Sequence, residues 1–171
     1  MLVRQFLISV TYLMATSLIL TGGLQLFFTR FVSDRLFERK FTRILPNLVG
    51  VLLLVTLTAG ILGTLLLWAL FDEPLTYRLL VLANFVTLCN LWLVIIFLSG
   101  MKAYNRILLV MLVGYSLMVV SAFLLSFMGL NGLLLALLMG HGSLLFIYLY
   151  DILREYRSDT LVAFDFLDKR Q

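Results

Sequence analysis

The sequence predicts an all-α integral membrane protein with about five transmembrane helices. Of its 171 residues, 63% are hydrophobic and only 13% are charged, whereas a soluble domain is about half apolar and about a quarter charged. The apolar residues also form long continuous runs, without the alternation typical of outer-membrane barrel strands. Because backbone polar groups in lipid must bond within their own segment, we expect each run to be a helix.

Five apolar segments approach or exceed the roughly 20 residues that cross the hydrocarbon core as a helix. We expect spans over residues 5–28, 48–71, 79–101, 107–127 and 130–150, with residues 1–171 forming a single membrane domain. The first segment is too long for the hydrophobic region of a signal peptide, and a basic cluster follows it. An odd span count is unusual for transporters built from paired repeats. We therefore expect a piece of something longer, with at least one span before Met1.

Basic residues alternate between the loops. The loops after the first, third and fifth spans are rich in Lys and Arg, whereas the loop after the second holds only Arg78 and the loop after the fourth, SFMGLNG, has no charge. Because cytoplasmic loops carry the excess of basic residues, the amino terminus is predicted to lie outside the cytoplasm. The carboxyl-terminal tail, residues 151–171, is predicted to lie inside.

The stretch FTRFVSDRLFERKFTRILPN, residues 28–47, gathers many of the charges. From Ser33 to Leu45 the apolar residues share one helical face. We expect a short amphipathic helix on the cytosolic surface over residues 30–46, with Ser33 or Asp34 capping its start and Pro46 in the first turn of the next span. Its cations orient the chain and contact anionic lipid, or they attract an anionic substrate or dock a cytosolic partner. These cations are Arg30, Arg35, Arg39, Lys40 and Arg43.

Strongly polar side chains are rare inside the spans, and no Asp, Glu, Lys or Arg lies deep in any of them. This argues against ion coupling housed in this part of the chain. Two interpretations of the remaining polar residues stay open: hydrogen bonds between packed helices, which are the commoner outcome, or groups that face a polar path. Aromatic faces suited to sugar stacking are offered by Tyr12, Trp92 and Tyr115. The candidates for lining a substrate path are Gln25, Asn84, Asn90 and His141.

Residues typical of catalysis or metal binding are not grouped in the sequence. Cys89 is the single cysteine and lies in an apolar segment, which is typical of a packing residue. The sequence has no metal-ligand spacing and implies no cofactor. Asp72 and Glu73 are adjacent in a short loop, which favours a solvated turn over an acid–base pair. The net charge of +4 follows from the basic cytoplasmic loops and does not indicate nucleic-acid binding. Close helix packing or kinks are indicated by Gly22-Gly23, Gly60-x-x-Gly63 and Gly129-x-x-Gly132.

Four stretches are informative together: LTGGLQLFFTRFVSDRLFERKFTRILPNLVG, FLSGMKAYNRILL, GLNGLLLALLMGHG and REYRSDTLVAFDFLDK. They resemble the PelG family of Pel exopolysaccharide transporters, over essentially the whole chain. The resemblance implies a flippase-like fold, in which two pseudosymmetric bundles of six helices surround a central cavity. The five spans would then be spans two to six of the first bundle, which agrees with the orientation inferred from the loops.

The resemblance implies a component of a bacterial inner-membrane transporter that exports Pel-type exopolysaccharide, the polymer of a biofilm. The growing glycan would pass through the bundle cavity. Implied partners are a cytosolic glycosyltransferase and other Pel membrane subunits, besides the lipid bilayer and the polysaccharide. No covalent chemistry is implied, so we do not expect an enzyme. The alternative is a non-transporting membrane scaffold of a polysaccharide synthase complex.

Overall fold

The computed structural model describes residues 2–38, 44–70, 72–101 and 104–155. Within these ranges the chain forms long α-helices and one short 3-10 segment, and no strand is present in the described part. The all-α class predicted from the sequence is confirmed. The elements are α1 (Leu2–Phe37), α2 (Ile44–Leu70), α3 (Leu75–Gly100), α4 (Tyr104–Leu125), the 3-10 helix η2 (Ser126–Met128) and α5 (Gly129–Glu155).

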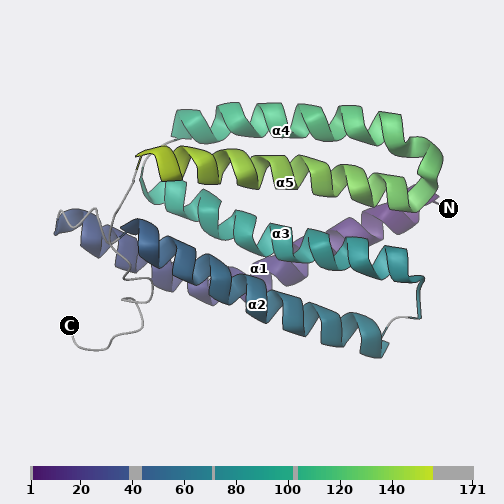
Figure 1. The fold of residues 1–171 in the computed structure, drawn as a ribbon, viewed down its shortest axis with the longest axis horizontal. Coiled ribbons are helices and arrows are strands. Elements are labelled where there is room, and N and C mark those ends of the chain that lie inside the picture. The colour runs from purple at the N-terminus through teal and green to yellow at the C-terminus, as the bar shows by residue number, and fades with distance from the viewer. Residues whose placement is uncertain (1, 39–43, 71, 102–103, 156–171) are drawn as a thin grey trace.

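Four continuous helical stretches of the described residues are long and apolar enough to cross a membrane. The first three correspond to α1, α2 and α3. The fourth, Tyr104–Arg154, contains both α4 and α5. These two helices run back along each other after the turn at η2 (Figure 1). The described residues therefore hold five long helices, at the positions in the sequence where five spans are predicted. The chain is a multi-pass helical membrane protein.

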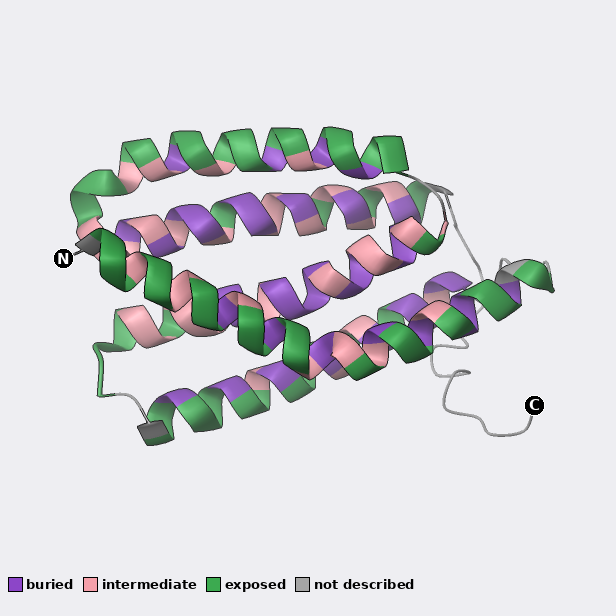
Figure 2. Ribbon diagram, turned by 180° about the vertical axis from the view of Figure 1, so that it is seen from behind, coloured by how far each residue is buried: buried purple, intermediate pink, exposed green. Residues whose placement is uncertain are grey.

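The helices are arranged around α3. In Figure 1, α4, α5, α3 and α2 follow one another in a layer, and α1 crosses behind α3. The turned view in Figure 2 shows many buried residues along α3 and α5, whereas much of α4 and of the amino-terminal half of α1 is exposed. The apolar core therefore lies between α3 and its neighbours. The exposed apolar faces of the outer helices suit contact with lipid tails.

α1 is longer than the predicted first span. Its 36 residues correspond to about 54 Å, which exceeds a hydrocarbon core of about 30 Å. The predicted amphipathic helix over 30–46 is not a separate element among the described residues. Residues 30–37 extend α1, and α2 begins at Ile44. Residues 39–43 lie outside the described ranges.

The sequence explains why α1 does not stop at the predicted boundary. No glycine or proline interrupts residues 30–37, and the α-helical bonding continues to the N–H of Glu38, which lies 3.0 Å from the carbonyl oxygen of Asp34. Ser33 does not cap a new helix, because its hydroxyl donates to the carbonyl of Thr29 within α1 at 2.9 Å. Pro46 does lie in the first turn of α2, as predicted.

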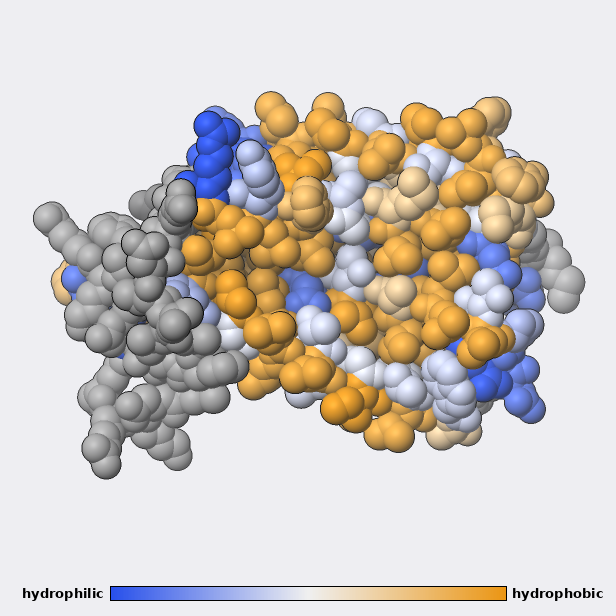
Figure 3. Space-filling view, viewed as in Figure 1, coloured by the Kyte–Doolittle hydropathy of each residue, from blue (hydrophilic) through white to orange (hydrophobic). Residues whose placement is uncertain are grey.

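Basic residues gather at one end of the helix bundle. The carboxyl ends of α1, α3 and α5 and the amino ends of α2 and α4 lie together at one end of the bundle, on the left in Figure 1. We call it the basic end, because Arg30, Arg35, Arg106 and Arg154 lie on these segments. Asp72 and Glu73 lie at the opposite end. Between the ends, hydrophobic side chains cover most of the face in Figure 3. The assignment of the basic end to the cytoplasm comes from the positive-inside rule.

Candidate functional site

The polar residues predicted from the sequence lie in different helix seams and do not form one cluster. Gln25 bonds along α1 to Thr21, Asn84 bonds from α3 to α5, Asn90 bonds from α3 to α2, and His141 on α5 meets Tyr115 on α4. All four side chains are buried. Each seam is therefore described separately.

Hydroxyl and amide groups line the seam between α1 and α3. Gln25 donates from Nε2 to the Thr21 hydroxyl at 2.7 Å, and that hydroxyl donates to the Ser17 carbonyl at 2.8 Å. Trp92 on α3 donates its indole N–H to the Ser17 hydroxyl at 3.0 Å. Ser17, Thr21 and Gln25 are four residues apart and thus share one face of α1. All three side chains are buried, and none of them carries a charge.

A further hydrogen bond extends this set toward the end opposite the basic end. The hydroxyls of Ser9 on α1 and Tyr77 on α3 are 2.9 Å apart. From Ser9 to Gln25 the helix axis advances about 24 Å, which is most of the thickness of a bilayer core. We call this set the polar line: Ser9, Ser17, Thr21, Gln25, Tyr77 and Trp92.

Asn84 connects α3 to α5. Its Nδ2 donates to the carbonyl of Leu80 on its own helix at 2.8 Å and to the carbonyl of Leu134 on α5 at 3.0 Å. The side chain is fully buried, and its Oδ1 accepts no hydrogen bond within the described ranges. Asn84 therefore forms a hydrogen bond between two helices, which is the commoner role of an amide inside a membrane bundle.

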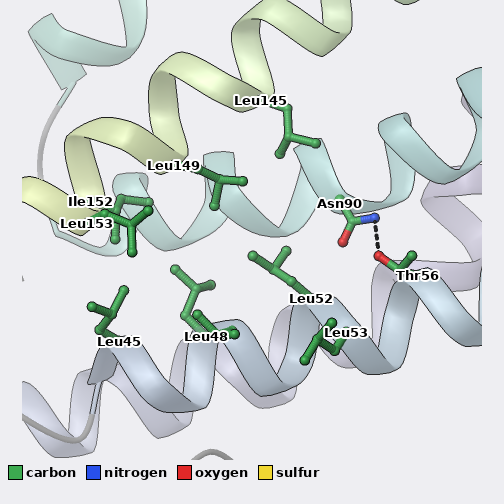
Figure 4. A pocket seen from close by; sticks show the side chains of 11 residues that line it. Leu45, Leu48, Leu52, Leu53, Thr56, Asn90, Leu145, Leu149, Ile152 and Leu153 are labelled. Carbon is green, nitrogen blue, oxygen red and sulfur yellow. Dashed lines mark hydrogen bonds between the residues drawn. The ribbon is translucent and has the colours of Figure 1, made fainter. Parts of the chain in front are cut away.

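Asn90 connects α3 to α2. Its Nδ2 donates to the Thr56 hydroxyl at 2.9 Å and to the Val86 carbonyl at 2.9 Å. It lies at one end of an apolar groove between α2 and α5, which Figure 4 shows with the Asn90–Thr56 bond. Asn84 and Asn90 are six positions apart and so point to different sides of α3.

His141 lies in the seam between α4 and α5. It is buried, and its Nδ1 lies 3.0 Å from the Leu137 carbonyl, so that nitrogen carries the proton. The ring of Tyr115 on α4 meets the imidazole edge to face, with centroids 6.1 Å apart. A Cβ at the neighbouring Gly140 would lie 2.5 Å from Met118 Cβ, whereas one at Gly142 would meet nothing within 4 Å. Of these two glycines, therefore, only Gly140 is needed for the close approach of α4 and α5.

The predicted docking cations differ in exposure. Arg30 is exposed, but Arg35 is buried. The Arg35 Nη1 lies 2.8 Å from a carboxylate oxygen of Glu38, and its guanidinium lies 5.1 Å from the centre of the Phe31 ring. Arg35 thus helps to hold its own helix end together. Arg39, Lys40 and Arg43 lie outside the described residues.

Sequence reasoning missed four members of the polar line, Ser9, Ser17, Thr21 and Tyr77. The spacing of Ser17, Thr21 and Gln25 was visible, and polar residues four apart inside an apolar span indicate a shared face. The pairing of Asn90 with Thr56 was not visible, because periodicity identifies a face but does not identify the helix that covers it. In the part of the chain that the structure describes, no group of three or more His, Cys, Asp or Glu is placed to hold a metal ion.

Long apolar helices, charges gathered at the helix ends, and amide and imidazole side chains buried inside the bundle define a multi-pass helical membrane protein. Comparison with protein families gives a more specific assignment: the sequence model of PelG, described as an exopolysaccharide exporter (EPS-E), matches residues 1–171. The chain therefore belongs to the PelG family. No curated protein and no solved structure matches it.

Proposed function

We propose that the chain is a membrane component of an exporter that moves Pel-type exopolysaccharide across the bacterial inner membrane. The observation that carries this proposal is the match to the exopolysaccharide exporter family over residues 1–171. The bundle of apolar helices supports it. In this proposal the helices are spans two to six of a six-helix, flippase-like bundle within a longer transporter. The basic end faces the cytoplasm, where a glycosyltransferase supplies the glycan.

The polar line is our candidate for the glycan path. Its hydroxyl, amide and indole groups exchange hydrogen bonds readily with sugar hydroxyls, and together they reach across most of the bilayer depth. These groups now bond to one another and to their own helices, so passage requires α1 to move away from α3. In the most apolar window of α1 only 17% of the residues are buried, against 44% for α3. Moving α1 therefore exposes less packed surface than moving α3.

The remaining polar candidates support the alternative function as a scaffold. The interhelical bond of Asn84, the Asn90–Thr56 bond and the edge-to-face contact of His141 with Tyr115 each connect two helices without a substrate. A scaffold would bind the glycosyltransferase and other Pel membrane subunits at its basic end. The exposed Arg30 is one group that could bind such a partner.

An export assay in the producing bacterium separates these functions. Gln25→Leu and Ser17→Ala should each lower secreted polymer severalfold, while the variant protein reaches the membrane and co-purifies with the synthase. The control is Thr58→Val on α2, because Thr58 is exposed and bonds only within its own helix. Export at the level of the native chain in both test variants would overturn the path. Loss of export only together with loss of co-purification would favour the scaffold.

Asn84 and His141 offer a second comparison in the same assay. Loss of export in Asn84→Leu or His141→Phe, with partner binding intact, would indicate that the substituted residue contributes to the transport path. Unchanged export in both would leave Asn84 and His141 with a role in helix packing alone. Neither outcome requires this chain to perform covalent chemistry, in keeping with a family described as exporters rather than enzymes.

A further inference from the structure

An apolar groove of about 280 Å³ lies between α2 and α5, with α3 beneath it. Leucines such as Leu48 and Leu52 on α2 approach it from one side, and Leu149 and Ile152 on α5 approach it from the other (Figure 4). The groove is partly open to the outside of the bundle. It lies apart from the polar line, whose residues are absent from its lining.

The groove runs from the basic end to the middle of the bundle. It begins beside Leu45 on α2 and Leu153 near the end of α5, and it reaches Thr56 and Asn90. From Leu45 to Thr56 the axis of α2 advances about 16 Å, roughly half the thickness of a bilayer core. The polar end of the groove therefore lies near mid-depth.

Asn90 gives this groove a specific chemical requirement. The residue is 6% exposed, and its Nδ2 is already bonded to Thr56 and Val86. Its Oδ1 is buried and accepts no bond from the described residues. A buried acceptor left unpaired is costly. At mid-depth an acyl chain offers no donor, whereas a neighbouring helix can supply a side chain that does.

We propose that the groove is the docking site of a transmembrane helix from a partner protein. That helix places apolar side chains between α2 and α5 and presents one donor, a hydroxyl, an amide or an indole N–H, to Asn90 Oδ1. A second copy of this chain fits less well, because a symmetric pair brings the same surface to both sides and a concave groove does not fill itself. The inference does not depend on what the complex exports.

A photocrosslinking amino acid tests the occupant in native membranes that contain the whole complex. The reactive group is placed at Leu149, which lines the groove. The matched control is Phe146, one turn earlier on α5 and 73% exposed. Sequencing of the adduct at position 149 should identify an apolar helical segment of a different protein, with a donor residue within one turn of the cross-link. Position 146 should give lipid adducts. Lipid alone at position 149, another copy of this chain, or a further span of the same polypeptide would overturn the proposal.

Substitutions in the probe-bearing protein test the role of the acceptor. Asn90→Leu should lower the cross-link yield per molecule in the membrane by roughly threefold or more, as expected for one interhelical hydrogen bond. Thr56→Val leaves Oδ1 in place and should keep the yield. Leu52→Trp, which fills the groove without changing Asn90, should also lower it. The proposal is wrong if Asn90→Leu behaves as Thr56→Val does, or if Leu52→Trp leaves the yield unchanged.

Discussion

Asn84 and Leu134 are fifty positions apart in the sequence, yet the side-chain amide of the first donates to the main-chain oxygen of the second at 3.0 Å. This bond joins the central helix α3 to α5 where neither side chain meets water. Hydrogen bonds between membrane helices stabilise them by about 0.6 kcal/mol on average and up to about 2 kcal/mol. The packing of α3 against α5 therefore combines apolar burial with one directional contact.

Removing this contact should destabilise the bundle measurably. We expect Asn84→Ala to lower the free energy of unfolding by about 1–2 kcal/mol, since it removes the bond and leaves a small cavity. The control is Thr64→Ala, because Thr64 is exposed and its hydroxyl bonds only to the Gly60 carbonyl. Thermal unfolding in a mild detergent measures both, and equal melting temperatures would contradict the prediction.

The pair Gly60-x-x-Gly63 should divide into one sensitive and one tolerant position. A Cβ at Gly63 would lie 2.7 Å from Leu82 Cδ1 and 3.1 Å from Phe85 Cδ1, whereas one at Gly60 would meet nothing within 4 Å. Gly63→Ala should therefore cost about 1–3 kcal/mol of unfolding free energy, as overpacking does. Gly60→Ala should stay within about 0.5 kcal/mol of the native chain. The same unfolding measurement tests both variants, and similar losses in unfolding free energy would contradict the prediction.

Gly132, which follows the turn between α4 and α5, should tolerate substitution poorly. A Cβ there would overlap the main-chain oxygen of Leu125, and a backbone atom cannot move aside as a side chain can. Gly132→Ala should thus disturb the turn between α4 and α5 and lower the amount of protein in the membrane severalfold. Gly142→Ala, later on α5 and with open space around it, serves as the control. Immunoblots of membrane fractions would show the difference, and equal amounts would refute it.

Tyr148 and Tyr150 form a matched pair for testing the α4–α5 seam. The Tyr148 hydroxyl is buried and donates to the Ile107 carbonyl on α4 at 2.8 Å, whereas Tyr150 is 57% exposed. Tyr148→Phe should lower the free energy of unfolding by about 1 kcal/mol, the usual contribution of such a bond. Tyr150→Phe should have little effect. A loss in Tyr150→Phe as large as that in Tyr148→Phe would mean that the seam bond contributes nothing.

The basic end should determine how the chain is oriented. Replacing Arg35, Arg39 and Lys40 together by Gln removes much of the charge that keeps this end inside, so topology or partner assembly should be disturbed. Reporter fusions after Pro74 and after Ala103, on opposite sides in the proposed orientation, measure the change. Arg78→Gln at the other end is the control. Normal reporter signals together with normal co-purification of partners would contradict the expectation.

The sequence was sufficient to predict the helices but not to predict which helices pack against one another. Continuous apolar runs bounded by charged loops predicted the long helices, because the cost of exposing backbone to lipid leaves few alternatives. The end of α1 was missed, since the pattern over 30–37 suits both a surface helix and a helix that continues beyond the bilayer. Within the glycine pairs, periodicity could not tell Gly60 from Gly63, because only the neighbouring helix makes them different.

The candidate residues show the same division. A buried amide in an apolar span was recognisable from the sequence, and Asn84 and Asn90 are both buried. The partners of these amides depend on how helices far apart in the sequence pack. Ser17 and Thr21 were overlooked because single hydroxyls are common in membrane helices. Their importance follows only from the hydrogen bonds that connect them to Gln25 and Trp92.

The reversal between α4 and α5 has a consequence for biogenesis. From Ile107 through Tyr150 the chain carries no Asp, Glu, Lys or Arg, and the turn itself is a single 3-10 segment followed by Gly129, whose φ of 66° lets the chain double back. No charged group has to be carried across the bilayer when this pair enters it. The two helices can therefore be released from the translocation machinery as one preassembled hairpin, anchored only by the basic residues at its two ends.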